Sequence, residues 1–446
     1  MENHKEKYTL SVAVNVVIAS MVGTGIFTAL GFQVADGAIP DGFSILVIWA
    51  LGGLLALCGA TVYGEVASYI GKSGGEYTFL TELYHPIIGF LSGWISLFVG
   101  FSAAIASLAL ATGEYILPFL GVDNDILFHI ASTEITTHKV IGFGVILIVA
   151  LIQFGGVAVG SVVQNALTGL KLAMIVFFLC SPFLVENLEW STNSLAPSEN
   201  SFETILSLPF AGALVWVMFS YSGWNASSYI VGHLKDAKRT LPLSLLLGTF
   251  IVAILYIALN VLFMLVANFD ELAGRVDIAN IVAEKMYGAE VALMFSLIFS
   301  MALVAGINAM FISGPRVTEQ MGQDYPKLQL FAKKNEQGAP YLSIIILFFI
   351  SGTLVVFSSF KEIIEYVGIT LSMFSMLTVA AVFIVRRRSD RSDNVVKAIG
   401  YPVTPILFII MTLWMIVYFV VLDPMTMVYS LLSLVPGIIV YFLVKK

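Results

Sequence analysis

Two short polar stretches interrupt apolar runs of membrane-spanning length, and their chemistry is the most informative in the chain. The first is Val22-Gly23-Thr24-Gly25-Ile26, inside the run 8–34, and the second is the stretch from Phe219 to Asn225. An interior glycine costs a helix about 1 kcal/mol, and a freed backbone N–H or C=O in hydrocarbon costs several more unless it is bound. Broken helices persist at membrane depth where they line a cavity, so the sequence predicts a binding site here.

The two ends of a broken helix offer partial charges of opposite sign. Free N–H groups of Thr24, Gly25 and Ile26 are expected to bind a carboxylate. Free carbonyls in the range Ala19–Val22, and others near Phe219 and Ser220, are expected to bind an ammonium group. These two sites together fit a zwitterion. A glycine at a helix-packing contact remains the alternative for either interruption alone.

The nature of the zwitterion's side chain follows from the charges nearby. No Asp or Glu lies near either break in the sequence. A cationic side chain would be buried without a partner at a cost of several kcal/mol, so a neutral side chain is expected. The predicted site comprises groups from both breaks: Ala19, Val22, Gly23, Thr24, Gly25, Ile26, Phe219, Ser220, Ser222, Gly223 and Asn225.

Lys171 is a single basic residue within the apolar run 161–185. About ten residues separate it from the nearer end of the run, which at about 1.5 Å per residue places it about 15 Å deep. The stem cannot easily reach water from that depth, so the ammonium group must face the protein interior or a wet cavity. Three interpretations stay open: a structural lysine bonded to backbone carbonyls, a fixed cation where a coupling ion would sit, or a group that gains and loses a proton.

Composition identifies the elements that must position these residues. The chain has 446 residues, 59% hydrophobic and 11% charged, with a mean hydropathy of +0.94. About 25% charged residues is typical of soluble domains, so we expect an all-α integral membrane protein, and strands are not indicated. Apolar runs of spanning length recur about twelve times: 8–34, 43–70, 86–118, 138–156, 161–185, 205–232, 241–268, 288–314, 340–358, 362–385, 402–422 and 425–444. The segment 270–285 predicts one or two short helices over the outer mouth.

The distribution of basic residues predicts the orientation. If the N-terminus lies inside, the outer loops hold only Lys139, Arg275, Lys285 and Lys361, while the inner loops hold nearly all the others. A multi-pass protein of the cell membrane with both termini in the cytoplasm is therefore expected. The net charge of -7 requires no nucleic-acid partner. No metal cluster, phosphate loop or pair of nucleophile and base is visible, so we expect no metal, no cofactor and no enzymatic activity.

Five motifs in chain order resemble those of the amino acid, polyamine and organocation (APC) superfamily. Residues 22–27 resemble its G-(S/T)-G-(I/V)-F break and residues 73–77 its S-G-G-x-Y loop. Residues 219–225 match its sixth-helix break, 235–242 its basic turn, and 315–326 the segment after its eighth helix. Within the superfamily the chain looks most like bacterial relatives of the L-type amino acid transporters.

The resemblance implies a LeuT-like fold with helices 1 and 6 unwound at mid-membrane. Two inverted five-helix repeats are expected at 8–185 and 205–385, followed by two additional helices at 402–444. In this group the fifth-helix lysine occupies the place of a sodium ion in sodium-coupled relatives, so Lys171 argues against sodium at that position. Phe219 matches the aromatic residue that gates the outer path, although a bulky aromatic on a buried helix face is more often a core residue.

Two residues depart from the family pattern. His233 stands where most members have a glutamate before the basic turn. Gly306, upstream of Asn308, stands near the place of a small hydroxyl residue that bonds the lysine in relatives. The usual inner charge pairing and the helix-8 partner of Lys171 are therefore both open.

These features predict a secondary transporter that moves small or neutral L-amino acids by alternating access, with sodium-independent exchange favoured by the resemblance. Proton-coupled symport is the alternative, and a non-transporting amino-acid receptor or membrane scaffold is the competing class. The expected partners are the amino acid and the lipid bilayer. An accessory subunit and the oligomeric state remain open.

Overall fold

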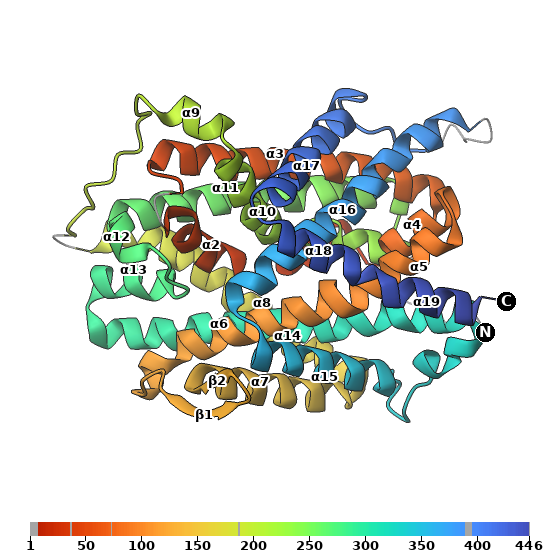
Figure 1. The fold of residues 1–446 in the computed structure, drawn as a ribbon, viewed down its shortest axis with the longest axis horizontal. Helices are drawn as coiled ribbons and strands as arrows, with labels where there is room; N and C mark the ends of the chain where they lie inside the picture. Colours follow the sequence, from red (N-terminus) through yellow and green to blue (C-terminus); the bar gives the residue numbers. More distant parts are fainter. Residues whose placement is uncertain (1–7, 36–37, 73, 186–187, 389–394, 446) are drawn as a thin grey trace.

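The computed structural model describes residues 8–35, 38–72, 74–185, 188–388 and 395–445, without the side chains of 156–163, 165, 232 and 233. Most helices run along one long axis (Figure 1). The short helices α12 (Phe269–Leu272) and α13 (Ile278–Tyr287) lie at one end, which we call the α13 end. Helices α4 (Gly75–Leu83) and α5 (Pro86–Ile95) lie toward the other, which we call the α4 end. Short helices over one mouth were predicted for 270–285, and α12 and α13 confirm them.

The described residues contain nine helical segments long and apolar enough to cross a membrane, and three shorter apolar helices. This establishes a multi-pass helical membrane protein. In the first part of the chain the helices are α1 (Leu10–Met21), α2 (Gly25–Val34), α3 (Gly42–Ile70), α6 (Ser102–Leu120), α7 (Thr137–Gln153) and α8 (Gly156–Cys180) with its 3-10 extension η3 (Ser181–Leu184). A π-helical turn, η2 (Ser96–Phe101), joins α5 to α6. The sequence predicted that run as one regular helix.

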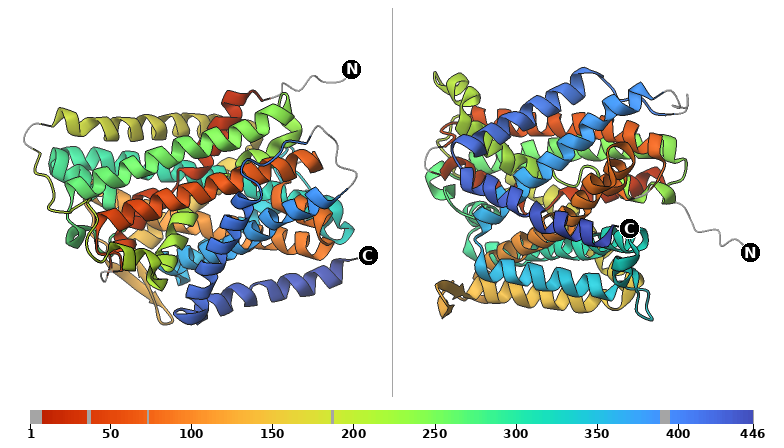
Figure 2. Two further views of the ribbon diagram at one scale, coloured as in Figure 1. Left: turned by 90° about the horizontal axis from the view of Figure 1, so that it is seen from above. Right: turned by 45° about the vertical axis from the view of Figure 1, so that its right-hand side comes forward.

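The second part of the chain also contains long helices and an interruption, which lies between α10 and η4. Its elements are α9 (Ser201–Leu206), α10 (Leu208–Ser220), η4 (Ala226–His233), α11 (Ala237–Val266), α14 (Ala289–Asp324), η5 (Pro326–Ala332), α15 (Tyr341–Phe357), α16 (Phe360–Arg387), α17 (Val403–Val421), α18 (Pro424–Leu432) and α19 (Leu434–Val444). Figure 2 shows α19 along the outside of the bundle. The run predicted to end near residue 314 continues to Asp324 through Pro315. Gly314 packs closely against Phe101 and Leu347, which supports the helix where the proline removes a backbone bond.

A β-hairpin between α6 and α7 departs from the predicted all-α fold. Strand β1 (Ile126–Ile130) pairs antiparallel with β2 (Thr133–Thr136), and Ala131 adopts a positive φ of 53° in the turn. The expectation of no strands was wrong here. Two strands of five and four residues give a far weaker periodic signal than the neighbouring membrane spans.

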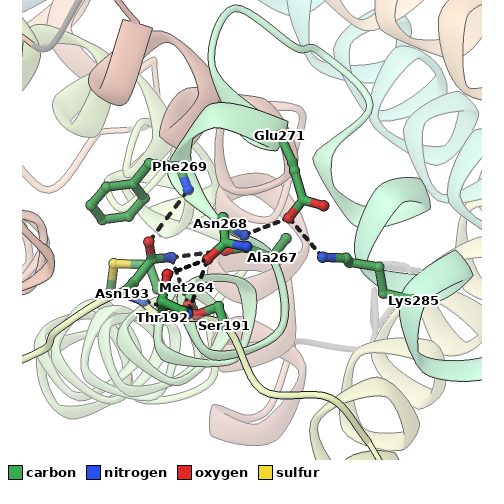
Figure 3. Close-up of polar contacts among 9 residues, drawn as sticks. All are labelled: Ser191, Thr192, Asn193, Met264, Ala267, Asn268, Phe269, Glu271 and Lys285. Carbon is green, nitrogen blue, oxygen red and sulfur yellow. Dashed lines mark hydrogen bonds and ion pairs between the residues drawn. The ribbon is translucent and has the colours of Figure 1, made fainter.

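The connection between η3 and α9 is tied to the α13 end by polar contacts (Figure 3). The Asn193 amide donates to the carbonyls of Met264 (2.9 Å) and Ala267 (2.8 Å) at the end of α11. The backbone N–H of Thr192 donates to Asn268 Oδ1 at 3.0 Å, and Asn268 caps α12. The Glu271 carboxylate also pairs with Lys285 of α13 at 2.7 Å (Figure 3). These contacts join residues 192 and 193 to the end of α11 and to the cap of α12, and they join α12 to α13.

Candidate functional site

The first predicted break is present between α1 and α2. Helix α1 ends at Met21 and α2 begins at Gly25. Among the described residues, none accepts a hydrogen bond from the backbone N–H of Thr24, Gly25 or Ile26. The start of α2 therefore has free donors, as the first turn of a helix must unless something caps it.

The second predicted break is also present, and it contacts the first. Helix α10 ends at Ser220, and a turn over 221–225 precedes η4. Gly223 has a φ of +97°, and a Cβ there would lie 2.7 Å from the carbonyl carbon of Ser20. A Cβ on Gly25 would lie 2.1 Å from Ser220 Oγ. Glycine is needed at both positions, because only a residue without Cβ permits this approach of the two breaks.

Lys171 lies against the end of the first half-helix. Its side chain is 1% exposed, and Nζ donates to the carbonyls of Val22 (2.5 Å) and Ala19 (3.2 Å). An ammonium at the C-terminal end of a helix is stabilised by the partial negative charge there. Both carbonyls were predicted to bind a substrate ammonium, and in this conformation they accept from the lysine instead. Gly306 does not reach the lysine and packs against Leu108.

Tyr256 of α11 bridges the two breaks, and sequence reasoning missed it. The hydroxyl oxygen lies 2.7 Å from the Met21 carbonyl and 3.0 Å from the Ser220 carbonyl. One phenol therefore contacts the last turn of both half-helices. A tyrosine within a long apolar run gave no sequence signal for this role.

A cavity of about 720 Å³ borders the breaks. Of the predicted site residues, the cavity is lined by Ala19, Phe219, Ser222, Gly223 and Asn225. The others, Val22, Gly23, Thr24, Gly25, Ile26 and Ser220, do not line it in this conformation. Phe219, one of the residues that line the cavity, is 9% exposed.

The cavity reaches the surface toward the α4 end and is covered at the α13 end. Its lining includes the exposed side chains of Arg316, Gln323 and Lys334. At the α13 end the Tyr115 hydroxyl donates to the Phe27 carbonyl at 2.8 Å and accepts from the Ala279 backbone N–H at 3.2 Å. Helix α2 is thereby held beneath α13. Within the described residues, the cavity lining reaches exposed side chains at the α4 end.

Glu76 contradicts the expectation that no carboxylate lies near a break. The positive φ of Gly74 (+116°) and Gly75 (+57°) turns the chain so that Glu76 lies in the first turn of α4, beside η4. Its Oε1 accepts from Tyr63 Oη (2.5 Å), Ser375 Oγ (3.1 Å) and Asn225 Nδ2 (3.3 Å). Burial raises the pKa of Glu76 above its ordinary value, while these three hydrogen bonds lower it. The sequence placed this residue in a loop about 150 positions before Asn225, so only the fold brings them together.

An amide network beside the cavity was also missed. Gln153 of α7 donates to Asn308 Oδ1 at 2.5 Å, and Asn308 of α14 donates to Gln164 Oε1 of α8 at 2.9 Å. Gln153 and Gln164 both line the cavity. Amides inside apolar runs are a signal that could have identified this network. Ser73 of the predicted loop motif lies outside the residues that the structure describes. For His233, which departs from the family pattern, the structure describes the backbone but not the side chain.

The model of the amino acid permease family matches residues 9–444. The chain belongs to this family, within the APC superfamily. The permease is 26% identical over 449 residues to the serine/threonine exchanger SteT of Bacillus subtilis (strain 168), covering 99% of this chain and 97% of the relative. It is 25% identical over 440 residues to the b(0,+)-type amino acid transporter 1 of Mus musculus, and the match covers 96% of this chain and 85% of that relative. The expected membership, the L-type likeness and the exclusion of an enzyme are confirmed.

Proposed function

We propose that this permease exchanges small or neutral L-amino acids across the cell membrane without sodium, by alternating access around the two breaks. The supporting observation is the arrangement at the first break. The ammonium of Lys171 donates to the carbonyls of Ala19 and Val22, while no acceptor in the described part of the chain binds the backbone N–H groups of Thr24, Gly25 and Ile26. A fixed cation thus lies where a coupling ion would bind, beside backbone N–H groups that can bind an anion.

The substrate carboxylate binds the free N–H groups of Thr24, Gly25 and Ile26 in this proposal. Because Ser220 covers Gly25, the two breaks must separate slightly to admit it. The ammonium binds carbonyls that Lys171 does not occupy, those of Ser20 and of the last turn of α10. Ser222 and Asn225, which line the cavity, then face the substrate side chain.

The proposed mechanism uses the inverted-repeat layout. Residues 8–185 and 205–385 form the two five-helix repeats, and 402–444 form two further helices. The α4 end faces the cytoplasm with both termini, so the cavity is open inward in this conformation. Rocking one helix group against the other closes this path and opens the α13 end, with Phe219 gating that side.

Proton-coupled symport is the second candidate, because the structure places no carboxylate within ion-pair distance of Lys171 among the described residues. A lysine held by neutral carbonyls alone can release its proton during the cycle.

Counterflow into proteoliposomes tests the proposal. Vesicles preloaded with unlabelled amino acid should accumulate labelled alanine or leucine, and accumulation of labelled arginine would show that Glu76, beside Asn225, admits a cationic side chain. Replacing sodium by choline and imposing a pH gradient should leave the rate unchanged. Acceleration by a sodium gradient would refute the role given to Lys171, and acceleration by a proton gradient would favour symport. Binding without counterflow would indicate a receptor or scaffold.

A further inference from the structure

Glu76 has no role in the proposed function, yet it lies against the second break. Glu76 is 7% exposed as a residue and lines the same cavity as Ser222 and Gly223. The donors on its Oε1 come from three different elements: Tyr63 of α3, Asn225 of the break and Ser375 of α16. Four segments of the chain therefore converge on one carboxylate at the cavity wall.

This carboxylate has hydrogen bonds but no counter-ion in the described part of the chain. Among the side chains that the structure describes, no Lys, Arg or His nitrogen lies within 4.0 Å of the Glu76 carboxylate, whereas Glu319, in the same cavity, pairs with Lys334 at 2.8 Å. A buried carboxylate without a cation is costly, and hydrogen bonds from neutral donors recover only part of that cost. Glu76 lines the cavity, so a mobile cation in the cavity can approach its carboxylate.

We propose that Glu76 is a release site for the ammonium group of the substrate between the two breaks and the open α4 end. The proposal rests on the proposed function, because it needs a zwitterion to pass through this cavity. The substrate leaves the break carbonyls, transfers its ammonium to Glu76 beside Asn225, and then enters the wider mouth lined by Arg316 and Gln323. Glu76 would then set the affinity at the inner face and leave the affinity at the outer face unchanged.

The test is the KM for L-alanine measured separately at each face. Inverted and right-side-out vesicles from the same expressing cells present the two faces, with vesicles from empty-vector cells as background. Glu76→Gln should raise the KM about tenfold in inverted vesicles, a loss of about 1.4 kcal/mol, and leave it within twofold in right-side-out vesicles. Glu319→Gln is the matched control, since its carboxylate already has a cation, and it should change neither value.

A second measurement uses the unmodified protein, so that it does not depend on the folding of a variant. Methylammonium chloride should inhibit L-alanine uptake competitively in inverted vesicles and not in right-side-out vesicles. Equal KM changes at both faces, or no change in Glu76→Gln, would overturn the release site. A potassium or sodium requirement that disappears in Glu76→Gln, with an unchanged alanine KM, would assign the carboxylate to an inorganic cation instead. Absence of L-alanine transport by the unmodified protein would refute alanine transport and this inference with it.

Discussion

Gly25 and Gly23 are two residues apart in the first break, but the structure predicts opposite responses to a single added methyl group. In Gly25→Ala the Cβ would lie 2.1 Å from Ser220 Oγ and 2.6 Å from Ser220 Cα. The backbone atom cannot rotate away, so the two breaks must move apart. In Gly23→Ala the nearest atom, the Met21 carbonyl oxygen, is 3.9 Å away, an ordinary contact.

Overpacking of a buried contact costs about 1–3 kcal/mol, which corresponds to about a 5- to 150-fold change in the population of the conformation that contains it. Gly25→Ala should therefore lower the population of the conformation in which the two breaks are in contact. Because exchange passes through this conformation, the exchange rate should fall at least about fivefold. Gly23→Ala should keep its rate within twofold.

The assay is counterflow of labelled alanine at matched protein amounts, with gel filtration of both variants in detergent to show that they fold. Gly25→Leu should in addition abolish binding, because a larger side chain fills the carboxylate site. Equal rates for the two alanine variants would show that the breaks do not meet at Gly25 during transport. Unchanged substrate affinity in Gly25→Leu would remove the proposed anion site.

Three further predictions follow from other contacts of the site. Lys171→Met should abolish counterflow in a protein that still folds, because two buried carbonyls lose their donor at about 1–3 kcal/mol each; unmodified rates would refute its role. Tyr256→Phe should slow exchange more than Tyr221→Phe, whose hydroxyl donates to the Trp49 carbonyl of α3 at 3.1 Å, and similar rates for both would contradict a bridge between the breaks. Because burial raises the folded pKa of Glu76, the folded state binds its proton more tightly, so its contribution to stability decreases as pH rises above 4.5. The melting temperature of the unmodified protein relative to Glu76→Gln should fall over that range, and a constant difference would contradict a raised pKa.

The local sequence was sufficient to predict the two breaks, because each break depends on residues that are close together in the chain. The glycines around Thr24 and within 219–225 disfavour helix at those positions, and in the structure α1 ends at Met21 and α10 ends at Ser220. The same holds for Lys171, whose depth alone required an internal partner, which the carbonyls of α1 supply. Hairpin β1–β2 and the π-turn η2 were missed because each involves few residues whose preferences are weak beside the neighbouring spans.

The sequence by itself determined that this protein is a helical membrane protein with two unwound sites and a buried lysine, since hydropathy and glycine placement act over a few residues. Only the tertiary structure decided which groups meet at those sites. It placed Glu76 beside Asn225, the Tyr256 hydroxyl between two carbonyls, and Lys171 on carbonyls predicted for the substrate. Contacts between residues about 30 to 300 positions apart depend on how whole helices pack, and no local pattern in one sequence records that packing.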